Sequence, residues 1–271
     1  MLGKLIKYEF KACGRTFLPI YIGIIIISIL NGLFSNYNLI PTLEDGIPLD
    51  TSVVGMQNVL ILVLFALFVA LFVITITLTI QRFNKNLLQD EGYLMFTLPV
   101  TTKNLILSKY LVAIIFVIFS GIVAITSFII IALCSRQINH INLFNVFNEM
   151  DLSTVDVFII FIDLFISFII SYSIFILTIY LSISVGQFSK LNKHKVPAGI
   201  ISFFIISTIV TKLQSFMDKI ILPESAYTQI TENLNVEYFG YDMILFVLNI
   251  IIAVVIFMGI YWILDKKLNL E

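Results

Sequence analysis

The chain has 271 residues, of which 59% are hydrophobic and only 12% carry a charge. Soluble domains contain about 25% charged residues, so this composition excludes a globular protein whose main solvent is water. The formal net charge of −1 indicates neither a strongly acidic nor a strongly basic partner, and no nucleic acid is expected to bind. The repeated apolar runs instead predict a protein of the lipid bilayer.

Residues 1–16 have the pattern of an amphipathic helix. Four basic residues form one narrow stripe, and the opposite side is apolar. The basic residues are Lys4, Lys7, Lys11 and Arg15, and the apolar residues are Leu2, Leu5, Ile6, Phe10 and Cys13. We predict an interfacial helix whose basic face meets anionic headgroups. Glu9 falls in the middle of the apolar face, where it either contacts protein (a cytoplasmic partner or another span) or extends to the headgroups.

Six apolar segments follow, and each is a candidate transmembrane helix. A helix needs about 20 apolar residues to cross roughly 30 Å of hydrocarbon. The segments are 17–34, 53–80, 105–133, 155–185, 196–210 and 241–264. The fifth is short, but Leu213, Phe216 and Ile220 continue it at helical spacing, so its outer end is expected to bend into the interface or lie along it. Pro197 suits the first turn of this helix.

The basic residues predict the orientation of these spans. Thirteen of the sixteen lysines and arginines fall in or beside 1–16, the second loop, the fourth loop and the C-terminal segment. Lysine and arginine accumulate in cytoplasmic loops, so both termini are expected in the cytoplasm. We therefore predict one all-α integral membrane domain over residues 1–271, with six transmembrane helices and no separate soluble domain.

The loop over residues 81–103 is unusually apolar and aromatic for a cytoplasmic segment. Asp90 and Glu91 precede a short apolar run, as the start of a helix prefers. Gly92 permits a sharp backbone turn, and Pro99 ends the element. Exposed aromatic residues on a short helix are typical of a docking surface. Burial of the same residues against the spans is the alternative interpretation. The run consists of Tyr93, Leu94, Met95, Phe96 and Leu98.

This loop resembles the cytoplasmic loop of ABC-2-type transporter permeases, and is more similar to that of the small stand-alone permeases of low-GC Gram-positive bacteria. The resemblance is carried by Asp90, Glu91, Gly92, Tyr93, Leu94, Phe96, Thr97, Leu98, Pro99, Val100, Leu105, Ser108 and Lys109, with a similar chain start at Lys7, Tyr8, Glu9, Phe10 and Lys11. The broader family has acid-Arg-acid, one residue and then Gly. Here Leu88 and Gln89 replace the first two of these, and the spacing from Gly92 to Pro99 is shorter.

The resemblance implies a specific division of labour. Such permeases pair into homodimers or heterodimers, and each subunit docks on a separate cytoplasmic ATPase through the helix in this loop, the coupling helix. The implied function is ATP-driven export across a bacterial cell membrane, in some cases export of, or immunity to, antimicrobial peptides. ATP and Mg would be bound by the partner ATPase, because the sequence contains no Gly-x-x-x-x-Gly-Lys-Ser/Thr phosphate loop. This chain is expected to carry no cofactor, metal site or catalytic residue.

A polar stripe runs along the fourth predicted span. Its members are Asp163, Ser167, Ser171, Thr178 and Ser182, with Asp156 extending it outward. At 100° per residue the five fall within roughly 100° of one another. Small hydroxyl residues commonly mark close helix packing. An ionisable group within a span tends to face a bundle interior or a wet cavity, so the other interpretation is a dimer seam or a translocation path.

Other functions remain open from the sequence. An intramembrane protease is poorly supported, because there is no His-Glu-x-x-His or Gly-x-Ser-x-Gly motif and no histidine in any predicted span. An ATP-independent secondary transporter or channel would need more intramembrane acids or broken spans. A membrane assembly factor is the third alternative. All three would function without an ATPase.

Overall fold

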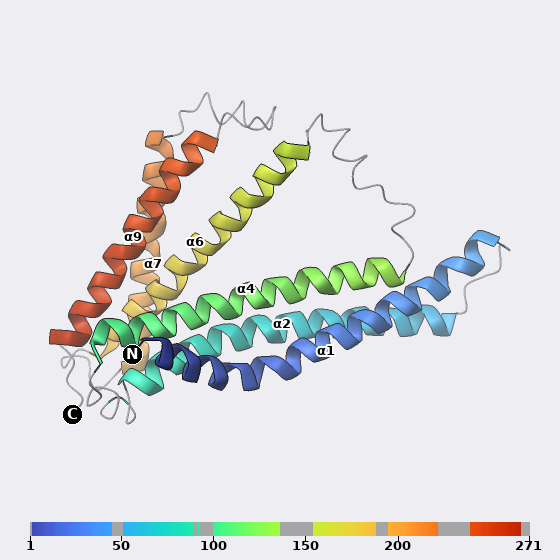
Figure 1. Ribbon diagram of the computed structural model, residues 1–271, viewed down its shortest axis with the longest axis horizontal. Coiled ribbons are helices and arrows are strands. Elements are labelled where there is room, and N and C mark those ends of the chain that lie inside the picture. Colours follow the sequence, from blue (N-terminus) through green and yellow to red (C-terminus); the bar gives the residue numbers. More distant parts are fainter. Residues whose placement is uncertain are drawn as a thin grey trace. The chain divides into compact units, whose positions relative to one another are not determined.

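The computed structural model describes residues 2–44, 51–88, 92, 100–135, 154–187, 195–221 and 239–266. These residues form long α-helices (Figure 1). The helices are α1 (Leu2–Glu44), α2 (Thr51–Leu88), α4 (Thr102–Cys134), α6 (Thr154–Gly186), α7 (Lys195–Ile221) and α9 (Phe239–Lys266). No strand occurs in this described part of the chain.

Within the described residues, six helices are long and apolar enough to cross a membrane. The shortest apolar stretch has 23 residues and the longest has 34, which meets the length that a bilayer requires. Only 6–28% of the most apolar window in each helix is buried inside the protein, so most apolar side chains face outward. This arrangement is consistent with an all-α, multi-pass membrane protein, as the composition predicted.

The helices extend beyond the predicted spans. α7 continues past residue 210 to Ile221 as one helix, because Lys212 and Lys219 interrupt its hydrophobicity without lowering its helix propensity. Pro197 is the third residue of α7, as expected for the first turn of a helix. No break separates residues 1–16 from the first span, because α1 is helical from Leu2 to Glu44.

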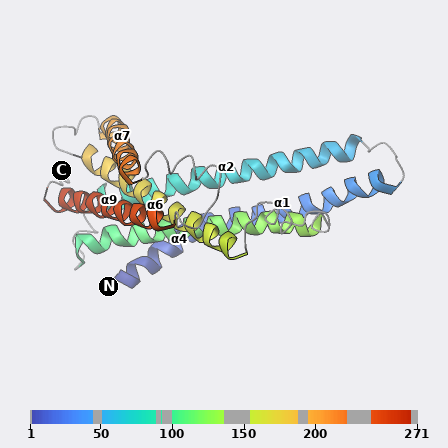
Figure 2. The same cartoon turned by 90° about the horizontal axis from the view of Figure 1, so that it is seen from above.

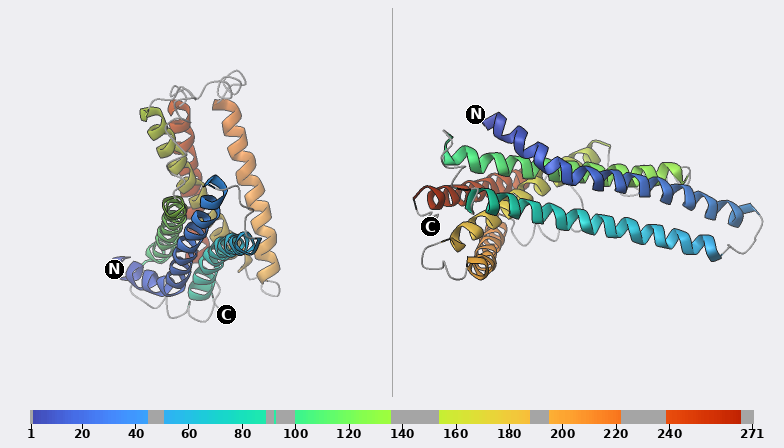
Figure 3. Two further views of the ribbon diagram at one scale, coloured as in Figure 1. Left: turned by 90° about the vertical axis from the view of Figure 1, so that its right-hand side faces the viewer. Right: turned by 90° about the horizontal axis from the view of Figure 1, so that it is seen from below.

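The chain divides into two compact units, which we describe separately. One unit contains most of α1, α2 as far as Leu78, and α4 from Ile115 onward. The other contains α2 from Thr79, α4 as far as Ile114, and all of α6, α7 and α9. The further orientations in Figures 2 and 3 allow each helix to be followed along its length.

In the first of these units, α1 and α4 pair in parallel. The Tyr21 hydroxyl lies 2.9 Å from the Ser120 hydroxyl, and the Ser28 hydroxyl lies 2.5 Å from the Ser127 hydroxyl. Both pairs are separated by 99 residues, so the register is constant over two turns. Consecutive spans alternate in direction, and the first and third spans therefore run the same way.

The start of α1 packs on α4 through aromatic rings. The Phe10 and Phe116 ring centroids are 4.9 Å apart, and those of Phe17 and Phe116 are 4.6 Å apart. Cys13 is 6% exposed on the same side of the helix. Protein therefore covers part of the face that was predicted to rest in lipid. α1 also bends in its N-terminal third (Figure 1), and Pro19 cannot form the helical hydrogen bond back to the Arg15 carbonyl at the end of that third.

In the second unit, α6 packs against both α7 and α9. A Cβ added at Gly186 of α6 would lie 2.8 Å from the Lys195 carbonyl oxygen and 3.1 Å from the Gly199 nitrogen, so glycine permits the close approach of α7. The Ser202 hydroxyl donates a hydrogen bond to the Ser182 carbonyl at 3.0 Å. α7 itself buries no residue completely.

Candidate functional site

The predicted coupling helix lies almost entirely outside the described residues. This applies to Asp90, Glu91, Tyr93, Leu94, Met95, Phe96, Leu98 and Pro99. Gly92 is described and is buried. A Cβ at Gly92 would lie 2.6 Å from the carbonyl oxygen of Leu87 and 2.9 Å from its carbonyl carbon. The close approach of two backbone segments therefore requires glycine at this position.

The end of α2 that leads into this loop is tightly packed. Phe83 and Leu87 are 0% exposed, and Leu88 is 6% exposed. The Phe83 ring stacks on Tyr180 of α6, with a centroid distance of 4.0 Å and an interplanar angle of 10°. Tyr180 is itself 1% exposed. The entry to the loop is thus fixed to α6 by two buried aromatic rings.

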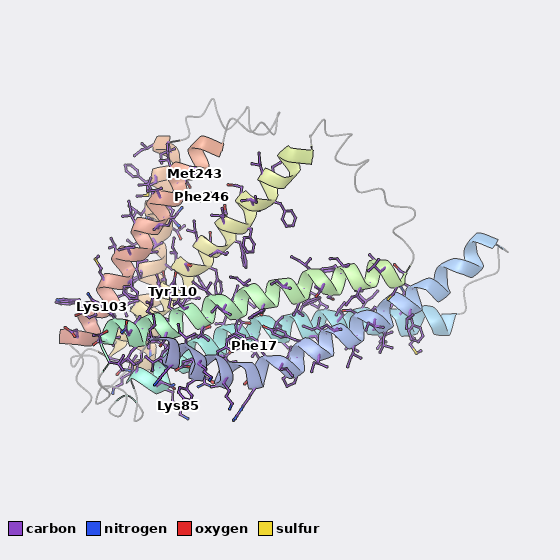
Figure 4. All side chains as sticks on the ribbon, in the orientation of Figure 1. Phe17, Lys85, Lys103, Tyr110, Met243 and Phe246 are labelled. Atoms are coloured by element: carbon purple, nitrogen blue, oxygen red, sulfur yellow. The ribbon has the colours of Figure 1, made fainter. Side chains whose placement is uncertain are left out.

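The start of α4, which follows the loop, is anchored to a different helix. The Thr102 hydroxyl donates a hydrogen bond to a carboxylate oxygen of Asp265 at 3.4 Å. Lys103 Nζ lies 4.8 Å from the centroid of the Tyr261 ring, a cation–π geometry. Figure 4 shows Lys103 at the end of α4, beside α9. Both Asp265 and Tyr261 belong to α9.

The residues just inside α4 are also buried, including polar ones. Leu105, Ile106 and Ser108 are at most 2% exposed, and Lys109 is 4% exposed. The Thr101 carbonyl accepts hydrogen bonds from the backbone nitrogens of Asn104 and Leu105, at 2.9 and 3.2 Å. Both ends of the loop are therefore held rigidly, one against α6 and the other against α9.

The polar stripe of α6 lies in two environments. Thr178 and Ser182 are buried, and their hydroxyls donate to the carbonyls of Ile174 and Thr178 of the same helix. Ser171 is exposed, and Asp163 and Ser167 are partly exposed. One carboxylate oxygen of Asp163, Oδ1, is buried and has no hydrogen-bond partner among the described residues. The side chain of Asp156 lies outside the described residues.

Glu9 is 8% exposed, so protein covers it. It shares the buried face of α1 with Cys13 and Phe17, which are 6% and 3% exposed. An ionisable side chain is rarely buried without interactions that compensate the lost hydration. The contact of Glu9 with a cytoplasmic partner stays a prediction.

Sequence reasoning missed a polar seam between α1 and its neighbours. It comprises the Tyr21–Ser120 and Ser28–Ser127 pairs and Asn31, whose amide donates to the carbonyls of Ile27 and Leu60 at 3.0 and 3.1 Å. Asn31 is 4% exposed. The seven-residue spacing of Tyr21 and Ser28, repeated by Ser120 and Ser127, is the signal that points to these contacts.

The described residues contain no group of three or more His, Cys, Asp or Glu side chains that could hold a metal ion. Comparison with protein-family models, curated proteins and solved structures found no match to this chain. The functional assignment therefore rests on the chain's own residues and on the resemblance of its loop.

Proposed function

We propose that this chain is the membrane permease subunit of an ATP-driven exporter, powered by a separate cytoplasmic ATPase of the ATP-binding-cassette type. In this proposal the segment from Asp90 to Pro99 is the coupling helix, and a second permease subunit completes the transport unit in a bacterial cell membrane. The exported compound belongs to an open class that includes antimicrobial peptides.

One observation supports this proposal most strongly: both ends of the loop are anchored to different helices. The entry is held to α6 by the Phe83–Tyr180 stack. The exit is held to α9 by the Thr102–Asp265 hydrogen bond and by Lys103 above Tyr261. A loop that receives a movement from a partner needs a stiff connection to the helices that must move.

The proposed mechanism follows from this connection. The partner ATPase binds and hydrolyses ATP, and its closure displaces the coupling helix. Buried side chains cannot slide independently, so the displacement passes through Phe83 to α6 and through Thr102 to α9. α6 carries Asp163 and the exposed Ser171, which places polar groups on a helix that moves. A change in the exposure of this stripe would alternately open and close a substrate path.

The proposal is tested by affinity purification of the chain from its native membrane in mild detergent, followed by mass spectrometry. An ATPase is expected to co-purify, and to be lost when Tyr93, Met95 and Phe96 are replaced together by alanine. A matched control replaces Phe204, Ile209 and Phe216 of α7, which are 60–65% exposed, and should retain the ATPase. Absence of an ATPase from the wild-type preparation, even after crosslinking, would favour a secondary transporter or an assembly factor instead.

A further inference from the structure

One face of α1 changes from cationic to apolar within a single turn. Lys4, Lys7, Lys11 and Arg15 are all exposed. The same face continues with apolar side chains that are between 40% and 58% exposed, namely Leu18, Ile22, Ile26, Ile29 and Leu33. At 100° per residue, all nine positions lie within about 100° of one another. The face is therefore one continuous stripe with a boundary between Arg15 and Leu18.

The protein covers the opposite face of α1 and leaves this stripe open. Glu9, Cys13 and Phe17 are at most 8% exposed on that opposite face, so the Glu9 carboxylate does not neutralise the stripe. None of the four cations forms an ion pair or a hydrogen bond with another described residue of the protein. Four positive charges on one exposed face make this surface attractive to an anionic partner.

We propose that this stripe, Lys4–Lys7–Lys11–Arg15, is a binding surface for the phosphate groups of anionic phospholipids. The position of the boundary favours lipid over other anions. Leu18 begins an exposed apolar stripe that hydrocarbon must cover if α1 spans the membrane. Arg15 is three residues away, about 4.5 Å along the helix axis, and so lies at headgroup level. The proposal depends on membrane insertion of α1 and is independent of the proposed export function.

The bend of α1 allows the remaining cations to reach the same layer. Along a straight helix, Lys4 would lie about 16 Å from Arg15, whereas the headgroup layer is only about 5–7 Å thick on each side. Pro19 cannot donate a hydrogen bond to the Arg15 carbonyl, and α1 bends in its N-terminal third (Figure 1). A tilted N-terminal segment keeps Lys4, Lys7 and Lys11 within reach of phosphate groups.

To test this, the purified full chain is reconstituted into bilayers with equal amounts of phosphatidylglycerol and phosphatidylcholine. Native mass spectrometry then counts the lipids of each kind that remain bound to the protein. The variant is Lys7→Gln/Lys11→Gln. The matched control, Lys7→Arg/Lys11→Arg, keeps both positive charges at the same exposed positions. Each cation near an anionic surface contributes a factor of about five in binding. Because the variant removes two cations, the ratio of bound phosphatidylglycerol to phosphatidylcholine should fall by up to about 25-fold in the variant and stay unchanged in the control.

High salt separates an electrostatic site from a packing effect. The difference between variant and wild type should shrink at about 0.5 M salt, where charges are screened within a few ångströms. An unchanged lipid ratio in a variant that melts like the wild type would overturn the proposal. Displacement of the lipid by about 10 mM inorganic phosphate in the wild type would also overturn it, because the stripe would then be a site for a soluble anion.

Discussion

The parallel contact between α1 and α4 makes a sharp prediction about Gly32. A Cβ at this position would overlap the Cβ of Cys134, and would lie 3.1 Å from the carbonyl oxygen and 3.3 Å from the Cα of Ile131. Two of these atoms belong to the backbone, so a rotamer change cannot relieve the contact. Gly32→Ala must push the two helices apart, and overpacking of this kind costs about 1–3 kcal/mol.

The matched control lies on the same helix. A Cβ at Gly23 would meet nothing within 4 Å, so Gly23→Ala should be neutral or should stabilise by up to about 1 kcal/mol through helix propensity. The two substitutions make the same chemical change. Both substitutions gain the same helix propensity, so we expect their unfolding free energies to differ by the steric cost alone, about 1–3 kcal/mol.

Thermal unfolding with a thiol-reactive fluorophore measures this difference. The Cys13 thiol is 6% exposed and should react when the surrounding helices separate, whereas the partly exposed Cys134 thiol should give an early signal in every variant that retains it. Gly32→Ala should melt several degrees below the wild type, at about 2–4 °C for each kcal/mol. The double variant Gly32→Ala/Cys134→Gly should recover part of the loss, because it removes one of the three close contacts. Equal melting temperatures for Gly32→Ala and Gly23→Ala would refute the parallel register of α1 and α4.

Three further predictions concern the other unit. The Gln214 amide donates a hydrogen bond to Asn249 at 2.8 Å, between α7 and α9. Replacement of either residue by leucine should lower the unfolding free energy, measured by thermal unfolding, by about 0.6–1.7 kcal/mol, and replacement of both should lower it by less than the sum. Gly92→Ala should reduce the amount of ATPase that co-purifies, because the added Cβ would meet the Leu87 carbonyl. Full recovery of the ATPase would show that docking does not need the close approach of Gly92 to Leu87. Asp163→Leu should raise the melting temperature measured by intrinsic fluorescence, because it removes the buried oxygen without a partner and so stabilises the fold by about 1 kcal/mol. The same variant should lower export, whereas a lower melting temperature would assign Asp163 a structural role.

Hydrophobicity predicted where the helices lie, but not where they end. All six apolar segments coincide with helices of the structure. The hydropathy averaged over a segment falls when the first charged residues enter it, whereas the backbone hydrogen bonds of the helix continue past those residues. α7 therefore runs past Lys212 to Ile221, as the helical spacing of Leu213, Phe216 and Ile220 predicted, and α1 begins at Leu2, within the predicted amphipathic helix. Hydropathy alone did not show that each extension is continuous with its span. Lysine and glutamate are good helix formers, so charge marks the edge of hydrocarbon without ending a helix.

The contacts between helices were not identified from the sequence. Ser28 and Ser127 are adjacent only because α1 pairs with α4 in one particular register, and the same residues would suit several others. Phe83 was one of many phenylalanines in an aromatic-rich chain, and nothing local distinguishes it as the ring that stacks on Tyr180. For the polar stripe of α6, periodicity predicted one shared face, but the structure buries Thr178 and Ser182 and exposes Ser171. The hydroxyls of Thr178 and Ser182 bond within α6, which the sequence did not show.

Site-specific photocrosslinking tests the central claim, the docking of an ATPase on the 81–103 loop, most directly. A photoreactive phenylalanine analogue would replace Phe96 in the loop and, as a control, Phe72 of α2, which is 66% exposed. Illumination of native membranes should link position 96, and not position 72, to a cytoplasmic ATPase identified by mass spectrometry. Adducts at position 96 that contain only lipid or other parts of this chain would contradict the exporter assignment.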